Sequence, residues 1–267
     1  MPYRPLAAGT GFVHVCAHRG HSIGAPENTI PALEAAAAHG ASVCEIDVVL
    51  SRDDEIVVIH DEILDRTTDG KGRVASFTMA ELTQFDAGGW FDSRFAGTRL
   101  PTLTQALTAA RKLGLVLLVE IKERQRPDRL IEILGDVLTA QRAIDDVLVI
   151  SFDHPSLQRA QARIAGLRTE IITHARHVDP AAVARNAGAA SVAIESDMFH
   201  PDDARALHAA GIATRVTIPR PDRIEHRRRH GLDPLASVIA GLREGLIDVL
   251  AGDDTRAVRA LVDRPAP

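Results

Sequence analysis

The feature that most constrains this chain is a repeated alternation of short apolar runs with segments of helical character. The apolar runs are continuous, as is typical of parallel strands covered on both faces. A segment with helical signals follows each run, and residues 102–113 begin with the capping-box pair Thr102 and Gln105. The apolar runs cover residues 13–17, 43–50, 115–121, 147–150, 168–172, 191–194, 212–218 and 248–251.

Eight strand–helix units in 267 residues predict an α/β fold of the (β/α)8, or TIM, barrel type. Such barrels routinely reach this length as one domain, so we expect residues 1–267 to form a single TIM-barrel domain. The alternative is an open, doubly wound sheet. The chain contains neither a P-loop nor a GxGxxG motif, so the usual nucleotide-binding signatures of such sheets are absent.

Residues 61–100 interrupt the alternation and are rich in Gly, Asp, Thr and Arg. Before them, a polar turn at residues 51–54 and an extended run at residues 55–59 predict a β-hairpin that closes on His60. A structureless loop of this length is uncommon inside a compact domain. We therefore expect a small insertion after the second strand, with short elements of its own and a helix near residues 79–85.

Two further helical segments carry specific expectations. Asn28 or Thr29 is expected to cap a helix that runs to Ala38, because both side chains are good N-caps. Residues 222–246 are interpreted as one helical region. The basic cluster at residues 227–230 lies within it, and we interpret this cluster as a solvated helix face.

Charge and hydropathy argue against several classes of partner. The net charge is −5, so no global basic field favours nucleic acid or an anionic membrane. No apolar run reaches the roughly 18 residues that a membrane span needs. Residues 1–10 lack the apolar core of a secretory signal, which favours a cytoplasmic location. Cys16 and Cys44 lie in predicted strands and are expected to be free, buried thiols.

Charged and imidazole side chains stand at or near the C-terminal ends of the predicted strands. In a barrel these ends share one mouth, and three apolar strands that end in charge are difficult to explain by packing. We therefore expect the polar side chains to lie together. They are His18 and Arg19 after the first strand, Glu45 and Asp47 in the second, His60 after the hairpin, and Glu120 and Lys122 at the third.

The carboxylates among these residues indicate a metal site. Glu45 and Asp47 are two positions apart, so on a strand they share one face. Two buried carboxylates on one face are costly unless a cation lies between them, and Glu120 can complete the set. Oxygen ligands favour Mg²⁺ or Ca²⁺. The alternative is a buried salt-bridge network in which Arg19 and Lys122 neutralise the carboxylates.

The remaining groups suit chemistry on a phosphate. His18 and His60 form a natural acid–base pair, since imidazole changes its charge near neutral pH. Arg19 can hold phosphoryl oxygens bidentately, and Lys122 can act as a compact point charge beside it.

These motifs in this order resemble the glycerophosphodiester phosphodiesterase family. The resemblance is strong over residues 13–165 and weaker beyond. It implies a TIM barrel that uses a divalent metal to hydrolyse glycerophosphodiesters to glycerol 3-phosphate and an alcohol. The matching motifs are His18-Arg19-Gly20, Pro26-Glu27-Asn28-Thr29, Glu45-Ile46-Asp47, His60-Asp61, Glu120-Ile121-Lys122 and Ser151-Phe152-Asp153.

The resemblance also implies roles for individual residues. Glu27 matches a residue near the substrate or metal, the alternative being a carboxylate that only stabilises a helix start. The other matches are Glu45, Asp47 and Glu120 to the metal ligands, His18 and His60 to the catalytic pair, and Arg19 and Lys122 to phosphate contacts.

The last third of the chain departs from the family pattern. Val216 stands where the family often has a tryptophan that packs on glycerol. One alternative is therefore a phosphodiesterase for a different small molecule, such as a sugar phosphodiester. Another is a phosphodiester-binding protein without turnover, and a third is a sphingomyelinase D-like activity. The sequence leaves three questions open. The attacking oxygen belongs either to water or to a neighbouring hydroxyl of the substrate, the base and the acid are not assigned between His18 and His60, and the oligomeric state is unknown.

Overall fold

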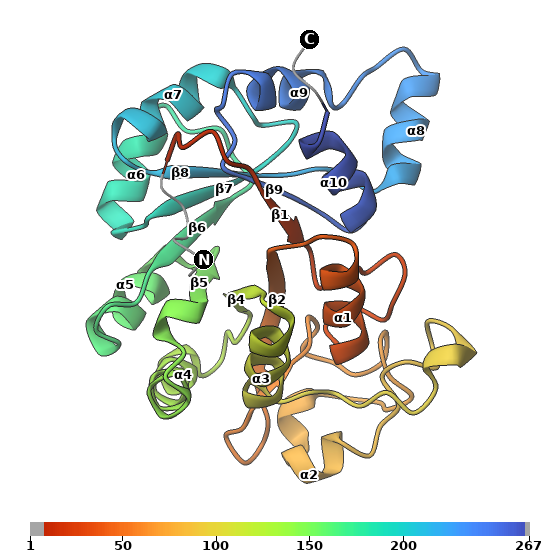
Figure 1. Ribbon diagram of the computed structural model, residues 1–267. Helices are drawn as coiled ribbons and strands as arrows, with labels where there is room; N and C mark the ends of the chain where they lie inside the picture. Colours follow the sequence, from red (N-terminus) through yellow and green to blue (C-terminus); the bar gives the residue numbers. More distant parts are fainter. Residues whose placement is uncertain (1–7, 265–267) are drawn as a thin grey trace.

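The computed structural model describes residues 8–264 and shows a closed barrel of parallel strands with helices around it (Figure 1). The sheet order is β1-β9-β8-β7-β6-β5-β4-β2, and pairing of β1 with β2 closes the ring. The predicted TIM barrel is therefore confirmed, and the open sheet is excluded. The strands of the ring are β1 (His14–Ala17), β2 (Val43–Leu50), β4 (Val116–Ile121), β5 (Val147–Ser151), β6 (Thr169–Thr173), β7 (Ser191–Glu195), β8 (Ala213–Thr217) and β9 (Val249–Gly252).

Helices follow the strands as the sequence predicts, with one correction near the C-terminus. The region 222–246 is two helices, not one, because Gly231 adopts a left-handed conformation at φ +76° and Pro234 disfavours a helical residue before it. The helices outside the insertion are α1 (Ile30–Ala38), α3 (Leu103–Leu113), α4 (Pro127–Gln141), α5 (His154–Arg163), α6 (Pro180–Ala187), α7 (Pro201–Ala209), α8 (Pro221–Arg229), α9 (Ala236–Arg243) and α10 (Thr255–Val262).

The insertion follows β2 and builds a small lobe with its own apolar cluster. Strand β3 (Ile56–Val58) pairs antiparallel with β2, which confirms the expected hairpin. The helix near residue 79 is only one turn long, α2 (Met79–Leu82), and Phe85 lies beyond its end, edge-to-face on Phe77. The lobe also contains two short 3-10 helices, Val74–Ser76 and Ser93–Phe95. Its cluster comprises Val49, Val57, Ile59, Leu64, Val74, Met79, Leu82, Ala87 and Leu100.

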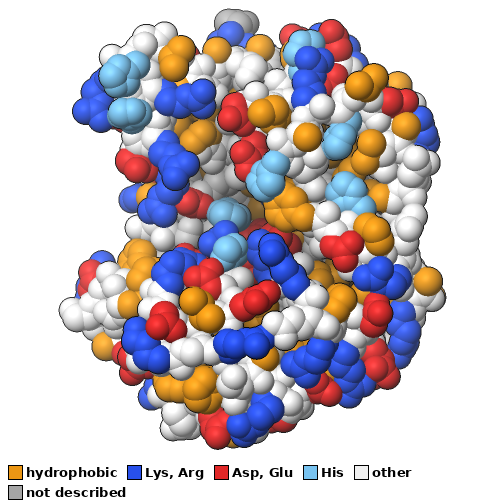
Figure 2. Space-filling model, turned by 180° about the vertical axis from the view of Figure 1, so that it is seen from behind, with side chains coloured by type: hydrophobic (Ala, Val, Ile, Leu, Met, Phe, Trp, Pro, Cys, Tyr) orange, Lys and Arg blue, Asp and Glu red, His pale blue; other side chains and the backbone are white. Residues whose placement is uncertain are grey.

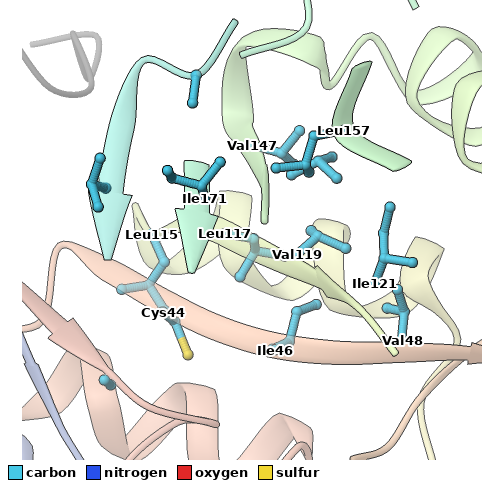
Figure 3. Packing of buried hydrophobic residues seen from close by; sticks show 14 of the residues in the cluster. Cys44, Ile46, Val48, Leu115, Leu117, Val119, Ile121, Val147, Leu157 and Ile171 are labelled. Carbon is cyan, nitrogen blue, oxygen red and sulfur yellow. The ribbon is translucent and has the colours of Figure 1, made fainter. Parts of the chain in front are cut away.

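Alternation along β2 and β4 separates an outer apolar layer from an inner polar one. Ile46 and Val48 of β2 pack with Leu117 and Val119 of β4 in the large cluster shared with the helices (Figure 3). The side chains between them face the barrel interior, where Val43 and Leu118 belong to a smaller apolar cluster. Above this cluster the inner face carries Glu45, Asp47 and Glu120, so the fold itself gathers the predicted carboxylates.

The same alternation keeps the two cysteines apart. Cys16 belongs to the inner cluster and Cys44 to the outer one, although β1 and β2 are paired neighbours. Both thiols are free and buried, as predicted. Among residues 8–264, no helix is long and apolar enough to cross a membrane. We expected residues 1–10 to lack a secretory signal. Residues 1–7 of this segment lie outside the described residues.

Candidate active site

A cavity of about 1080 Å³ opens at the C-terminal ends of the strands. Figure 2 shows the molecule hollowed there, with imidazole, basic and acidic side chains in the hollow. Six of the eight predicted site residues line it, namely His18, Arg19, Glu45, His60, Glu120 and Lys122. Asp47 lies beneath them, fully buried, and Glu27 lies beside Arg19.

Three buried carboxylates form the base of the site. Asp47 and Glu120 are register partners on β2 and β4, and Glu45 stands two positions before Asp47 on the same face. One oxygen from each lies within 4.8 Å of the other two, a spacing that suits a shared metal ion. Glu45 Oε1 and Asp47 Oδ1 are buried and accept no hydrogen bond. The oxygen donors and the two unsatisfied atoms fit a hard divalent cation such as Mg²⁺ or Ca²⁺.

Two cations also reach this cluster, so part of the alternative salt-bridge network is present. Arg19 Nε lies 3.3 Å from Asp47 Oδ2, and Lys122 Nζ lies 2.6 Å from Glu120 Oε1 and 3.6 Å from Asp47 Oδ1. They do not neutralise all three carboxylates. Burial, together with the charge of Asp47, raises the pKa of Glu45 to about 8, and burial also raises the pKa of Glu120. A further cation would therefore stabilise the negative charge of this cluster.

Each predicted catalytic histidine is held by a carboxylate at Nδ1. His18 Nδ1 lies 2.6 Å from Asp253 Oδ1, and His60 Nδ1 lies 2.6 Å from Asp61 Oδ1. Burial lowers the pKa of His18, but the hydrogen bond to Asp253 and the charge of Glu45 outweigh burial, and the net pKa is raised. A carboxylate at Nδ1 orients the ring and leaves Nε2 for a substrate.

A chain of ion pairs connects the two histidine loops. Arg66 of the insertion contacts Asp61 through Nε at 2.7 Å and Glu27 through Nη1 at 2.8 Å. Glu27 in turn accepts a hydrogen bond of 3.0 Å from Arg19 Nη1. Glu27 therefore bridges two arginines and is not among the carboxylates that cluster at the candidate metal site.

The backbone after β1 is left-handed at two non-glycine positions, Arg19 (φ 58°) and Asn28 (φ 58°). The N–H of Arg19 donates to Glu45 Oε2 at 2.9 Å, and the N–H of Asn28 donates to the carbonyl of Arg19 at 3.0 Å. Gly20 follows with φ +82°, and a Cβ there would lie 2.5 Å from Ala32 Cβ on α1. Strained backbone concentrates where the fold must deliver a side chain to a fixed place, here Arg19.

The expected capping of α1 is wrong in its details. Thr29 occupies the N-cap position, but its hydroxyl donates to the carbonyl of Pro26 at 2.6 Å and makes no cap bond. Asn28 instead binds Asp47 twice. Its amide donates to Asp47 Oδ2 at 2.8 Å, and its carbonyl oxygen accepts from the Asp47 N–H at 3.0 Å. Asn28 thus orients the carboxylate at the centre of the cluster.

Sequence reasoning missed three residues of the site: Asn28, Arg66 and Asp253. Asp253 directly follows β9, so the strand-end argument that selected His18 also applies to it. Arg66 gives no local signal, because its partners Asp61 and Glu27 are 5 and 39 positions away. Asn28 was read as a helix cap because caps and carboxylate holders use the same side chains.

The far side of the cavity is lined by β6, β7, β8 and the segment after β8. Val216 stands at the position where the family often has a tryptophan. Its side chain is fully buried in the outer core and does not line the cavity. Phe152 supplies aromatic surface instead, stacked on His174 at 4.5 Å between ring centroids and 5.7 Å from Lys122 Nζ. Deeper in the barrel, Arg215 forms a buried ion pair with Glu170, with Nη2 2.7 Å from Oε1.

Comparisons with known proteins agree with this geometry. The family described as glycerophosphoryl diester phosphodiesterase matches residues 18–237. The Bacillus subtilis (strain 168) protein YhdW is 40% identical over 162 residues, which are 60% of this chain and 66% of that protein. A glycerophosphodiester phosphodiesterase of Caldanaerobacter subterraneus subsp. tengcongensis is 36% identical over 171 residues, 62% of this chain and 69% of the relative. The matches thus cover about two thirds of the length of each of these two relatives.

The fold comparison covers nearly the whole chain. The structure of an Oleispira antarctica phosphodiesterase in complex with the product sn-glycerol-3-phosphate has a TM-score of 0.80 and 28% identity. The superposition covers 95% of this chain and 98% of that one. The family match spans well over half of the chain and includes all eight predicted site residues, from His18 to Lys122. The chain therefore belongs to the glycerophosphoryl diester phosphodiesterase family.

Proposed function

We propose that this protein hydrolyses glycerophosphodiesters to glycerol 3-phosphate and an alcohol with the aid of a divalent cation. The observation that carries the proposal is a single cavity onto which three buried carboxylates and two carboxylate-held histidines converge. Family membership and the likeness to a phosphodiesterase in complex with sn-glycerol-3-phosphate support glycerol 3-phosphate as the product.

Glu45, Asp47 and Glu120 are the residues that would hold the cation. When bound there, Mg²⁺ or Ca²⁺ supplies Lewis-acid polarisation of a phosphoryl oxygen. Arg19 and Lys122 line the same cavity and already face the carboxylate cluster. Their fixed positive charges stabilise negative charge that grows on the phosphoryl oxygens in the transition state.

His18 and His60 move the protons. One ring accepts a proton at Nε2 from the attacking oxygen, which belongs to water or to a neighbouring hydroxyl of the substrate. The other ring donates a proton to the leaving alkoxide. Asp253 and Asp61 hold the opposite nitrogens at 2.6 Å, so neither ring turns away and each imidazolium is stabilised when it forms.

The proposed function is tested with a panel of diesters, assayed with and without a chelator, in which the product carrying the phosphate is identified. We expect glycerol 3-phosphate from glycerophosphoglycerol or glycerophosphocholine. Turnover of a sugar phosphodiester alone would instead favour a different substrate class, and binding of every diester without turnover would favour a binding protein.

Removal of the metal should abolish turnover. We expect chelator-treated protein to be inactive and added Mg²⁺ or Ca²⁺ to restore activity and raise the melting temperature, because the cation neutralises buried like charges. Asp47→Asn should lose both responses. Asp136→Asn, at an exposed carboxylate of α4 paired with Arg163, should keep them. Full turnover by protein shown to be metal-free would contradict the assignment.

His18→Ala and His60→Ala should each reduce kcat by about 10²-fold or more, the scale of general acid–base catalysis. His39→Ala, at the end of α1 and outside the cavity lining, is the matched control and should stay within about twofold. Steady-state kinetics with metal at saturation measure the effect. Near-normal turnover in either site variant would remove that histidine from the mechanism.

Asp253→Asn should reduce kcat by about 10-fold or more, because the amide no longer stabilises the His18 imidazolium. It should also lower the pKa of His18, since the hydrogen bond to Asp253 raises it in the parent. The pH–rate limb that belongs to His18 should therefore move to lower pH. An unchanged pH profile would show that Asp253 does not position His18.

Asn28→Ala should lower the metal affinity by about 10–100-fold, as expected for the loss of a group that orients a metal ligand. Asn28 holds Asp47 through two hydrogen bonds, so its loss frees that carboxylate. Metal titration by calorimetry measures the effect. Asn186→Ala, on α6, is the control and should bind metal like the parent, whereas equal affinity of both variants would contradict this role of Asn28.

A further inference from the structure

Helix α8 contributes a basic part of the cavity lining that the proposed chemistry does not use. Four of its residues and Arg220, which precedes it, line the cavity with nitrogen-bearing side chains: Arg220, Arg223, His226, Arg227 and Arg229. Ile224 is the helix's one buried residue. Figure 1 places α8 at one side of the barrel. In the reversed view of Figure 2, basic and histidine side chains gather at that edge of the hollow.

The arginines of this lining lack partners within the protein. The side chains of Arg223, Arg227 and Arg229 make no ion pair or hydrogen bond with any residue in the range 8–264. Arg228 of the same helix differs, since its Nη2 lies 3.2 Å from Asp233 Oδ1 and it does not line the cavity. The unpaired arginines of α8 are thus those that line the cavity.

Nearby acids do not balance these arginines. Four carboxylates line the cavity outside the metal cluster, and three are already occupied. Glu195 pairs with His174 at 2.9 Å, Asp222 lies 3.9 Å from Arg220, and Asp253 holds His18. Asp197 is left without an ion pair in the described part of the chain. The cavity lining of the described residues therefore holds one carboxylate without an ion pair and three such guanidinium groups.

Helix stability does not account for this arrangement. Arg227 and Arg229 lie in the last turn of α8, where the negative end of the helix dipole stabilises a cation. The dipole therefore explains these two arginines. Arg223 lies in the first turn, where the dipole disfavours a cation. Arg223 and Arg227 are also four positions apart, and like charges at that spacing destabilise a helix. A negatively charged ligand would offset both the unfavourable dipole at Arg223 and the repulsion between Arg223 and Arg227.

Contacts at the start of α8 connect it to the catalytic groups. Arg220 Nε lies 3.6 Å from Asp253 Oδ2, and Asp253 holds His18. The basic lining therefore begins next to the proposed catalytic histidine and extends along the same cavity. A diester whose phosphate lay at the metal cluster would extend one of its two halves into this lining.

We propose that α8 binds the alcohol half of the diester and selects alcohols that carry a second anionic group, a phosphomonoester or a carboxylate. This inference rests on the proposed function and adds the substrate class to it. Arginine suits the role because its planar guanidinium binds such groups bidentately.

The test compares two diesters that differ only in this group, glycerophosphoinositol and glycerophosphoinositol 4-phosphate. Calorimetry on the His18→Ala protein with Mg²⁺ measures binding without requiring turnover. We expect the 4-phosphate to bind about 10-fold or more tightly. R223Q/R227Q should reduce this preference to about twofold or less. R228Q removes one charge from the same helix away from the cavity and should keep the full preference.

Equal affinity of the two diesters for the His18→Ala protein overturns the inference, as does a preference that survives R223Q/R227Q. Binding to phosphatidylglycerol vesicles that needs Arg223 and Arg227, without a preference between the diesters, overturns it and assigns α8 to a membrane surface. The proposed function fails separately. If the parent turns over no diester but the binding preference holds, the anionic subsite stands and the hydrolase assignment falls.

Discussion

The site depends above all on the pairing of β2 with β4. Their register sets Asp47 opposite Glu120, and the pleat turns Glu45 to the same side. A slip of β2 by one residue would turn Glu45 and Asp47 into the outer apolar layer and Ile46 into the barrel, away from Glu120. Burial of the outer side chains therefore fixes the register. The hydrophobic free energy of this layer holds three like charges within reach of one ion.

Charges gathered in this way need polar support, and the structure supplies it from the loops. Asn28 and Arg19 come from the loop after β1, Lys122 from the end of β4, and Arg66 from the insertion. Because Arg66 and Glu27 join the loop of His60 to that of Arg19, the insertion is part of the site's framework. The strain at Arg19 fits this picture, since its backbone and its side chain both bind the carboxylate cluster.

Much of the fold and part of the site could be predicted from the sequence. Continuous apolar runs mark buried parallel strands, and charge at their ends marks the mouth, which selected His18, Glu45, Asp47 and Glu120. The break at Gly231 was missed because helical composition on both sides concealed it. Asn28 was misread because one side chain suits either a cap or a carboxylate. The basic cluster at residues 227–230 is a solvated face as predicted, since three of its four residues are exposed and Arg227 is half-buried. Composition does not show that Arg227 and Arg229 also border a cavity.

The sequence by itself determined the period of the barrel and the chemical types at its strand ends, because hydrophobic burial and strand pleating act on neighbouring residues. Tertiary structure alone decided which carboxylate holds which histidine, as with His18 and Asp253, which are 235 positions apart. It also decided that arginines of α8 without an ion pair among the described residues line the same cavity as His18 and Glu45. Such pairings depend on closure of the ring, where β1 meets β9, and no local pattern encodes that meeting.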